Sequence, residues 1–245
     1  MASPFTRLRP LALAACLTIA AMAAVSPTPA RAVVCASSVA LPTSGGLGDY
    51  RLRDHFESGG FGKWTGRTAE GDARAYVGTA RKVSGWCAGR LVVTSAWNSK
   101  ANVWRQLPSG TRDVWVTGWF RVDREGLWGS NVPTWRLFAG SQRIADVHRQ
   151  NGTGDLWLRT ANGSGGWRYT KLNRRIALGT WHRIQLHVYA NWSGSDIEVR
   201  VDGDLAYRNL SHWLPVGRLD RAMIGAEHRR QVMDLWFDDA VIRSS

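Results

Sequence analysis

The chain has 245 residues and carries 32 lysines and arginines against 19 acidic residues, a formal net charge of +13. This surplus favours anionic partners, such as acidic polysaccharide, cell-wall polymers or nucleic acid. Beyond the N-terminus no apolar run approaches the length of a membrane span, so we expect no membrane-spanning helix in the body of the chain. The length suffices for one large core, and all-β sandwiches often reach it as a single domain.

The first 32 residues have the pattern of a cleavable signal peptide. Two arginines precede an apolar stretch at 11–25, and residues 30–32 supply a small-x-small cleavage site. The alternatives are a retained N-terminal anchor and lipidation at Cys16, although the apolar segment before Cys16 is short. Cleavage removes three arginines and no acid, which leaves a charge of +10. We expect a secreted, extracellular protein that begins near Val33.

Export leaves two cysteines, Cys35 and Cys87, in an oxidising compartment. We predict that they form a disulfide, which would pin the N-terminal segment to the body of the protein. No Cys/His spacing suggests a zinc site. Residues 33–48 lack periodicity and form a lead-in, so the expected domain occupies 49–245.

After the lead-in, short strands alternate with glycine-rich turns, without a convincing helix. Apolar and polar residues alternate most regularly at 181–190 and 197–202, and Asp202-Gly203 then has the sequence of a tight hairpin turn. In chain order, the expected strands are 50–57, 73–77, 90–94, 102–107, 114–122, 134–139, 142–149, 156–160, 167–171, 181–190, 197–202, 222–226 and 232–243. Many short strands of this kind indicate a β-sandwich or barrel.

Several segments resemble the concanavalin A-like lectin/glucanase superfamily, in particular its laminin G-like and polysaccharide-lyase-like members. They are GTWHRIQLHV at 179–188 followed by IEVRVDG at 197–203, DHFESG at 54–59 with Trp64, and MDLWFDDAV at 233–241. The resemblance spans roughly residues 50–243. It implies a secreted bacterial member with an all-β jelly-roll sandwich of two antiparallel sheets, whose first and last strands pair. It says less about function, because this fold hosts binders, hydrolases and lyases.

Family members hold polysaccharide on a concave sheet face, and here one polar, aromatic face is expected to do the same. Tryptophan and tyrosine rings stack on sugars at a low entropic cost. The alternative is an ordinary solvated face, which antiparallel sheets commonly have. The candidate ligand-binding residues are Trp115, Trp119, Arg121, Asp146, His148, Arg183, Gln185, His187, Tyr189, Glu227, His228 and Gln231.

The residues needed for two enzymatic reactions, hydrolysis and β-elimination, can be sought in the sequence. A glycosidase needs paired carboxylates, but the Glu-x-Asp-x-x-Glu strand of the family's glucanases is absent, so hydrolysis is disfavoured. A polysaccharide lyase needs a His or Tyr to remove a proton and Arg or Gln to neutralise the uronate carboxylate. Residues of these types are His187, Tyr189, Gln185, Arg183 and His148, and Gln185 and His187 have the Gln-x-His spacing of alginate lyases.

No cofactor is required by these residues, but the resemblance implies a possible structural calcium ion. Glu57, Asp238 and Asp239 could supply its oxygen ligands, or could instead be hydrogen-bonded acids that hold the terminal strands together. Nucleic acid is discounted as a partner, because the sequence has no basic helix and no RNA-binding aromatic motif. We expect a monomer.

The leading hypothesis is therefore a secreted carbohydrate-binding protein without catalysis of its own. The alternative is a lyase that cleaves a uronate-containing acidic polysaccharide by β-elimination. A third class is a surface module that binds protein.

Overall fold

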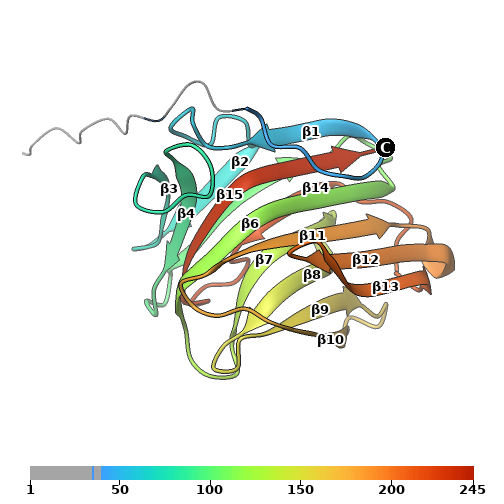
Figure 1. Ribbon diagram of the computed structural model, residues 1–245. Helices are drawn as coiled ribbons and strands as arrows, with labels where there is room; N and C mark the ends of the chain where they lie inside the picture. Colours follow the sequence, from blue (N-terminus) through green and yellow to red (C-terminus); the bar gives the residue numbers. More distant parts are fainter. Residues whose placement is uncertain (1–34, 36–39) are drawn as a thin grey trace, which may run out of the picture. The chain divides into compact units, whose positions relative to one another are not determined.

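A computed structural model describes Cys35 and residues 40–245 (Figure 1). The expected signal peptide, at 1–32, lies outside the described residues. Within them, the chain forms fifteen strands and one short 3-10 helix, Trp192–Gly194. No helix in this part of the chain has the length and hydrophobicity needed to cross a bilayer. The expectation of an all-β chain is confirmed for the residues that the structure describes.

The strands form two antiparallel sheets, which we call sheet A and sheet B. Neighbouring strands are antiparallel throughout the described pairings. In spatial order, sheet A contains β13 (Asp204–His212), β12 (Ser195–Val201), β11 (Trp181–Tyr189), β6 (Asp113–Glu125), β15 (Met233–Ser244), β4 (Ala88–Val93) and β3 (Arg74–Gly78), with β1 (Asp49–Asp54) also paired to β15. Sheet B contains β10 (Trp167–Arg175), β9 (Asp155–Ala161), β8 (Gln142–Gln150), β7 (Asn131–Ala139), β14 (Arg221–Gly225), β5 (Lys100–Gln106) and β2 (Gly66–Glu70).

The core lies between the two sheets and follows the alternation of each strand. In β11, Ile184, Leu186 and Val188 are completely buried, while the residues between them are half-exposed. Sheet B contributes Leu137 and Leu158 to the same core cluster. Each such side chain stabilises the fold by about 1.5–3 kcal/mol relative to exposure. The outer faces of both sheets are thereby left to the alternate, mostly polar positions.

Two local predictions are confirmed where the chain turns and where it ends. Asp202 and Gly203 have φ angles of 54° and 95° and join β12 to β13, as a two-residue hairpin turn requires. Strand β1 pairs with β15 from Asp54 opposite Ala240 to Asp49 opposite Ser244. The first and last strands therefore lie in one sheet, as the resemblance implied.

Two strands were not predicted, and both lie at the end of a sheet. Strand β2 ends sheet B, and β13 ends sheet A. No residue of β2 is buried, and in β13 only His212 is. A strand without a buried apolar face shows no alternation of apolar and polar residues in its sequence. Such a strand can be recognised only from its hydrogen bonds to the neighbouring strand.

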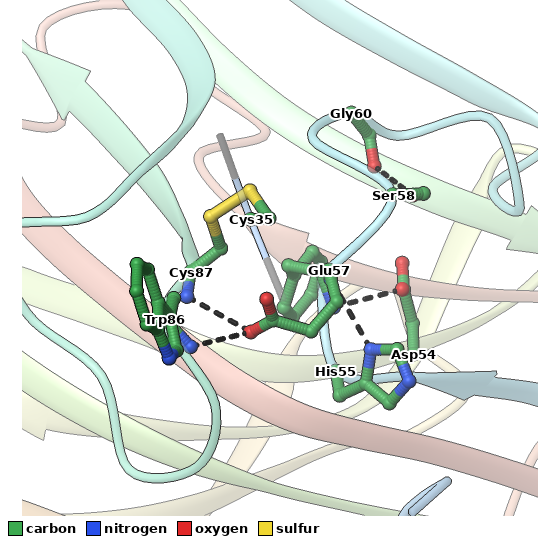
Figure 2. Close-up of a disulfide and its surroundings, with 9 residues drawn as sticks. Cys35, Asp54, His55, Glu57, Ser58, Gly60, Trp86 and Cys87 are labelled. Carbon is green, nitrogen blue, oxygen red and sulfur yellow. Dashed lines mark hydrogen bonds between the residues drawn. A yellow bond between two sulfur atoms is a disulfide. The ribbon is translucent and has the colours of Figure 1, made fainter. Parts of the chain in front are cut away.

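The predicted disulfide between Cys35 and Cys87 is present, with the two Cα atoms 5.6 Å apart (Figure 2). It joins the lead-in to the residue that precedes β4. The carboxylate of Glu57 lies beside it, where Oε1 accepts hydrogen bonds from the backbone N–H groups of Trp86 (2.8 Å) and Cys87 (2.9 Å). The disulfide and the Glu57 carboxylate therefore both hold the backbone at Trp86 and Cys87.

Candidate functional site

The sequence-predicted site residues are divided between the two sheets. Trp115, Trp119, Arg121, Arg183, Gln185, His187 and Tyr189 lie on β6 and β11 of sheet A, whereas Asp146 and His148 lie on β8 of sheet B and Glu227, His228 and Gln231 follow β14. The outer faces of two packed sheets point in opposite directions. The expectation that these residues share one face is therefore wrong, because periodicity gives the side of a strand but not the sheet to which it belongs.

On sheet A, the lead-in covers part of the outer face. The rings of Trp115 and His187 stack with centroids 3.8 Å apart, and His187 Nε2 lies 2.7 Å from an Asp113 carboxylate oxygen. A Cβ atom on Gly46 would lie 2.6 Å from the Trp115 ring, so the lead-in backbone rests directly on it. Trp115 thus packs between the lead-in and the imidazole of His187.

Arginine side chains on the same face secure the lead-in further. Arg183 donates to the Thr43 carbonyl (3.3 Å), and Arg243 donates to the carbonyls of Ser44 (3.2 Å) and Gly48 (2.8 Å). These contacts place part of the predicted sheet A surface beneath the chain itself. This face is the weaker candidate for a ligand.

On sheet B, five of the predicted residues come together around a group of arginines. We call the arginine cluster the set Arg136, Arg143, Asp146, His148, Arg159 and Glu227. Adjacent strands bring it together, because Asp146 is opposite Arg136 of β7 on one side and opposite Arg159 of β9 on the other. His228 is exposed beside Glu227, and Gln231 accepts a hydrogen bond from Arg136 (3.3 Å).

Asp146 is the centre of the arginine cluster. One of its oxygens accepts two hydrogen bonds from Arg159, at 2.6 and 3.0 Å, and lies 2.9 Å from Arg143 Nε. The other oxygen lies 3.0 Å from His148 Nδ1. Burial alone would raise the pKa of Asp146, but the hydrogen bond with His148 and the charges of Arg136 and Arg159 outweigh it, so the pKa is held well below its usual range. The carboxylate is ionised at neutral pH.

The imidazole of His148 is neutral and fixed in one tautomer. Burial lowers the pKa of His148, and the hydrogen bond and negative charge of Asp146 offset this only in part. Since Asp146 is ionised, Nδ1 must be the protonated nitrogen that donates to it. The lone pair is then on Nε2, for which the described residues offer no hydrogen-bond partner. This arrangement is that of a general base held by a carboxylate.

Glu227 joins the β14–β15 loop to the arginines. Its Oε2 accepts a hydrogen bond from Arg143 (2.9 Å) and lies 3.6 Å from Arg136 Nη1. Burial and the charge of Asp146 act in opposite directions on Arg136, and burial prevails, lowering the pKa of Arg136 to about 9. Because both carboxylates of the cluster are paired with arginines, neither is suited to donate a proton as a glycosidase acid.

Two aromatic rings lie over the arginines. The guanidinium carbons of Arg143 and Arg159 lie 4.4 and 5.1 Å from the Trp167 ring centroid, and that of Arg159 lies 5.8 Å from Tyr169. The Tyr169 ring meets His148 edge to face at 6.5 Å. Tyr169 is 53% exposed, so an aromatic surface faces solvent above cations.

Sequence reasoning missed Arg136, Arg143, Arg159 and Tyr169. Arg143 and Asp146 are three residues apart, which places them on opposite faces of a regular strand. A register shift between Leu137 and Phe138 inserts one extra residue into β8 and brings Arg143 to the Asp146 side. Arg159 lies between the buried Leu158 and Thr160, whereas Tyr169 has no buried neighbour in its strand. Only the pairing of β9 with β8 and β10 places both residues beside His148.

The carboxylates proposed for calcium are engaged by hydrogen bonds. Asp238 Oδ2 accepts from the backbone N–H groups of Val83 (2.8 Å) and Ser84 (3.2 Å), and Asp239 Oδ1 accepts from the Ser84 hydroxyl (2.7 Å). In the described part of the chain, the group of potential ligands that does converge is Glu57 with the two disulfide cysteines, and those sulfurs are already bonded. A calcium ion and hydrogen-bonded acids that hold the terminal strands together remain the two alternatives for these residues, and the hydrogen bonds favour the second.

Comparison with solved structures identifies proteins of similar fold. Neither the family models nor the curated proteins that were compared match the sequence. Among solved structures, an endo-β-1,4-glucuronan lyase from the fungus Trichoderma reesei has a TM-score of 0.61 at 12% identity, over 76% of this chain and 93% of that one. A PL-14 alginate lyase from Aplysia kurodai has a TM-score of 0.55 at 14% identity, over 75% and 92% of the two chains. Domain 4 of AbnA, a GH43 extracellular arabinanase from Geobacillus stearothermophilus in complex with arabinotriose, has a TM-score of 0.53 at 13% identity, over 75% and 84%. At these identities the likeness concerns the fold alone, and the chain has the concanavalin A-like jelly-roll fold that these carbohydrate-active proteins share.

Proposed function

We propose that the chain binds a uronate-containing polysaccharide across the outer face of sheet B. The observation that carries the proposal is the arginine cluster beneath Trp167 and Tyr169. Three arginines face two carboxylates there, so the site has a net charge of +1 with His148 neutral. Guanidinium groups form paired hydrogen bonds with carboxylates, and aromatic rings stack on sugars.

The fold neighbours and the disulfide support this proposal. Two of the similar structures are lyases of acidic polysaccharides, glucuronan and alginate, and the third holds an arabinose oligosaccharide. The Cys35–Cys87 disulfide favours an oxidising, extracellular location, where such polymers occur. The formal net charge of +13, or +10 after the expected cleavage, would strengthen the attraction of the chain to a polyanion.

The experiment compares retention of the protein by polyglucuronate and by a neutral glucan in affinity electrophoresis. Tyr169→Ala is expected to weaken binding to polyglucuronate about tenfold, because it removes the exposed ring over Arg159. Tyr50→Ala is the matched control, since Tyr50 on β1 is also exposed and also lies 4.7 Å from two arginines. Equal effects of the two variants, or equal retention by both polymers, would contradict the proposal. Retention by neither polymer would favour the protein-binding class.

A second candidate, β-elimination at the same site, is favoured by the state of His148. Arg159 or Arg143 would pair with the uronate carboxylate and make the adjacent C5 proton more acidic. His148 Nε2 would take that proton, the C4–O bond would break, a C4=C5 double bond would form, and the leaving oxygen would gain a proton. We assign that proton to the hydroxyl of Tyr169, whose ring centroid lies 6.5 Å from that of His148. This proposal assigns the base to His148 and not to His187, whose ring is stacked on Trp115 and whose Nε2 lies 2.7 Å from Asp113.

Ultraviolet absorbance of the unsaturated product distinguishes the lyase from the binder. If the site is catalytic, polyglucuronate or alginate will generate this signal with the wild type, His148→Gln will abolish it, and Tyr169→Phe will reduce it while ring stacking is kept. His187→Gln serves as the control on sheet A and should leave the rate unchanged. Binding without any product in the wild type would assign the site to recognition alone.

A further inference from the structure

A cavity of about 670 Å³ lies at one end of the sandwich, away from the arginine cluster. Its walls come from the loop before β6, the β7–β8 turn, the 3-10 helix and the β13–β14 loop, and they include Arg112, Gly140, Trp192 and Arg218. A second cavity of about 280 Å³ adjoins it and shares Arg218 and Asp220. Cavities of about 300–1,000 Å³ are the usual size for small-ligand sites.

Trp192 is held rigidly at this cavity while its side chain is 56% exposed. Its backbone N–H donates to the Val216 carbonyl (3.1 Å), and its own carbonyl accepts from Leu214 (3.0 Å). Its φ of 51° is in the left-handed region, which few non-glycine residues adopt. Gly217 lies against the ring, where a Cβ atom would be 2.7 Å from the indole Nε1. The chain thus fixes a flat, exposed indole in one orientation, as a sugar-stacking platform requires.

The charges at this cavity favour an anion. The guanidinium groups of Arg112 and Arg218 have neither a hydrogen-bond nor an ion-pair partner among the described residues, and both residues are exposed. Asp220 is the acidic residue of the cavity wall, and its carboxylate already accepts a hydrogen bond from the Gly140 backbone. Two arginines therefore remain free to bind a ligand carboxylate here.

We infer that this cavity is a second saccharide site, which binds an acidic sugar unit by stacking on Trp192 and pairing its carboxylate with Arg112 and Arg218. The inference goes beyond the proposed function, because the two sites lie at opposite ends of β14. Asp220 precedes β14 and Glu227 follows it, and at about 3.3 Å per residue they are roughly 20 Å apart. The adjoining smaller cavity gives room for a further sugar unit beside Arg218.

The test follows the tryptophan indole N–H signals in two-dimensional NMR spectra while a short oligoglucuronate is added. Trp192→Phe and Trp167→Phe identify the two reporter signals, one for each site. We expect both signals to move with oligoglucuronate, and the Trp192 signal to move at least fivefold less with an uncharged cello-oligosaccharide at the same concentration. Arg218→Glu should abolish the Trp192 response and leave the Trp167 response unchanged.

The matched control is Arg124→Glu, because Arg124 is also exposed and lies at the far end of β6 from Arg112. It should leave both responses as in the wild type. If the Trp167 signal moves and the Trp192 signal does not, the inference is overturned and the proposed function stands. Movement of the Trp192 signal alone supports the second site and removes the proposal for sheet B. A protein in which neither signal moves contradicts both.

Discussion

Replacing Asp146 with asparagine tests whether one buried carboxylate holds the arginine cluster together. The side chain is completely buried and interacts with Arg143, Arg159 and His148 at 2.6–3.0 Å. The substitution Asp146→Asn would keep the size of the side chain but remove its charge. The cluster would then contain three guanidinium groups and only the carboxylate of Glu227, so its net charge would rise from +1 to +2.

The expected loss of stability is large because the arginines are buried as well. Arg136 is completely buried, and Arg143 and Arg159 are 5% and 8% exposed. Breaking a buried ion pair by removing one partner costs about 3–5 kcal/mol. For a domain of this size, each kcal/mol lowers Tm by about 2–4 °C, so Asp146→Asn should lower it by roughly 6–20 °C at pH 7.

Thermal unfolding of the variant, followed by circular dichroism, measures this effect. Asp155→Asn is the control, because Asp155 forms a surface ion pair with Lys171 (2.8 Å) and its loss should lower Tm by no more than about 4 °C. Folding lowers the pKa of Asp146 below the ordinary 3.8, so its contribution is complete above that pH and is lost as the pH falls through the folded-state pKa. The gap between wild type and Asp146→Asn should therefore shrink below about pH 4. If Asp146→Asn costs no more than Asp155→Asn at pH 7, the electrostatic account of the cluster is refuted.

Three further predictions concern the segment near the disulfide. Replacing Cys35 and Cys87, which are 52 residues apart, by serine should destabilise the fold by about 4 kcal/mol on the chain-entropy estimate, and an unchanged denaturation midpoint would contradict this. Burial raises the pKa of Asp238 to about 7, so the folded chain keeps a proton that the unfolded chain releases between pH 3.8 and about 7. As the pH rises across that window, stability of the wild type should fall relative to Asp238→Asn, as chemical denaturation at pH 5 and pH 8 would measure, and parallel pH profiles would count against it. Because the carboxylates of this segment are hydrogen-bonded, Tm should be the same in EDTA and in millimolar calcium; an increase with calcium that Glu57→Gln abolishes would instead support a bound ion.

Local sequence patterns predicted a β-sandwich or barrel, and the family resemblance implied the jelly roll, but neither assigned the residues to one site. The Asp202-Gly203 turn and the strand β11 were predicted from the pattern of adjacent residues, and the disulfide was predicted from the expected export of the chain. The structure contains all three features. His148 and His187 each occupy the seventh position of a nine-residue strand, and each follows a buried aliphatic residue, Val147 and Leu186. The two histidines have different surroundings because their strands pair with different partners. Strand β9 brings Arg159 to one side of β8, whereas β6 brings Trp115 beside His187.

The arginines of the cluster were missed for a further reason, which also bears on function. The formal net charge of +13 is most simply explained by arginines exposed to solvent, and the sequence pattern gives no reason to place any of them in the interior. Arg136, Arg143 and Arg159 are instead buried around Asp146, where desolvation opposes their charged form. If this face of sheet B served only as a solvated surface, the protein would be more stable with these arginine side chains exposed to solvent. Local departures from favourable burial are concentrated at functional sites, so the cost of burying these arginines supports the proposal that the ligand binds on sheet B and not on sheet A.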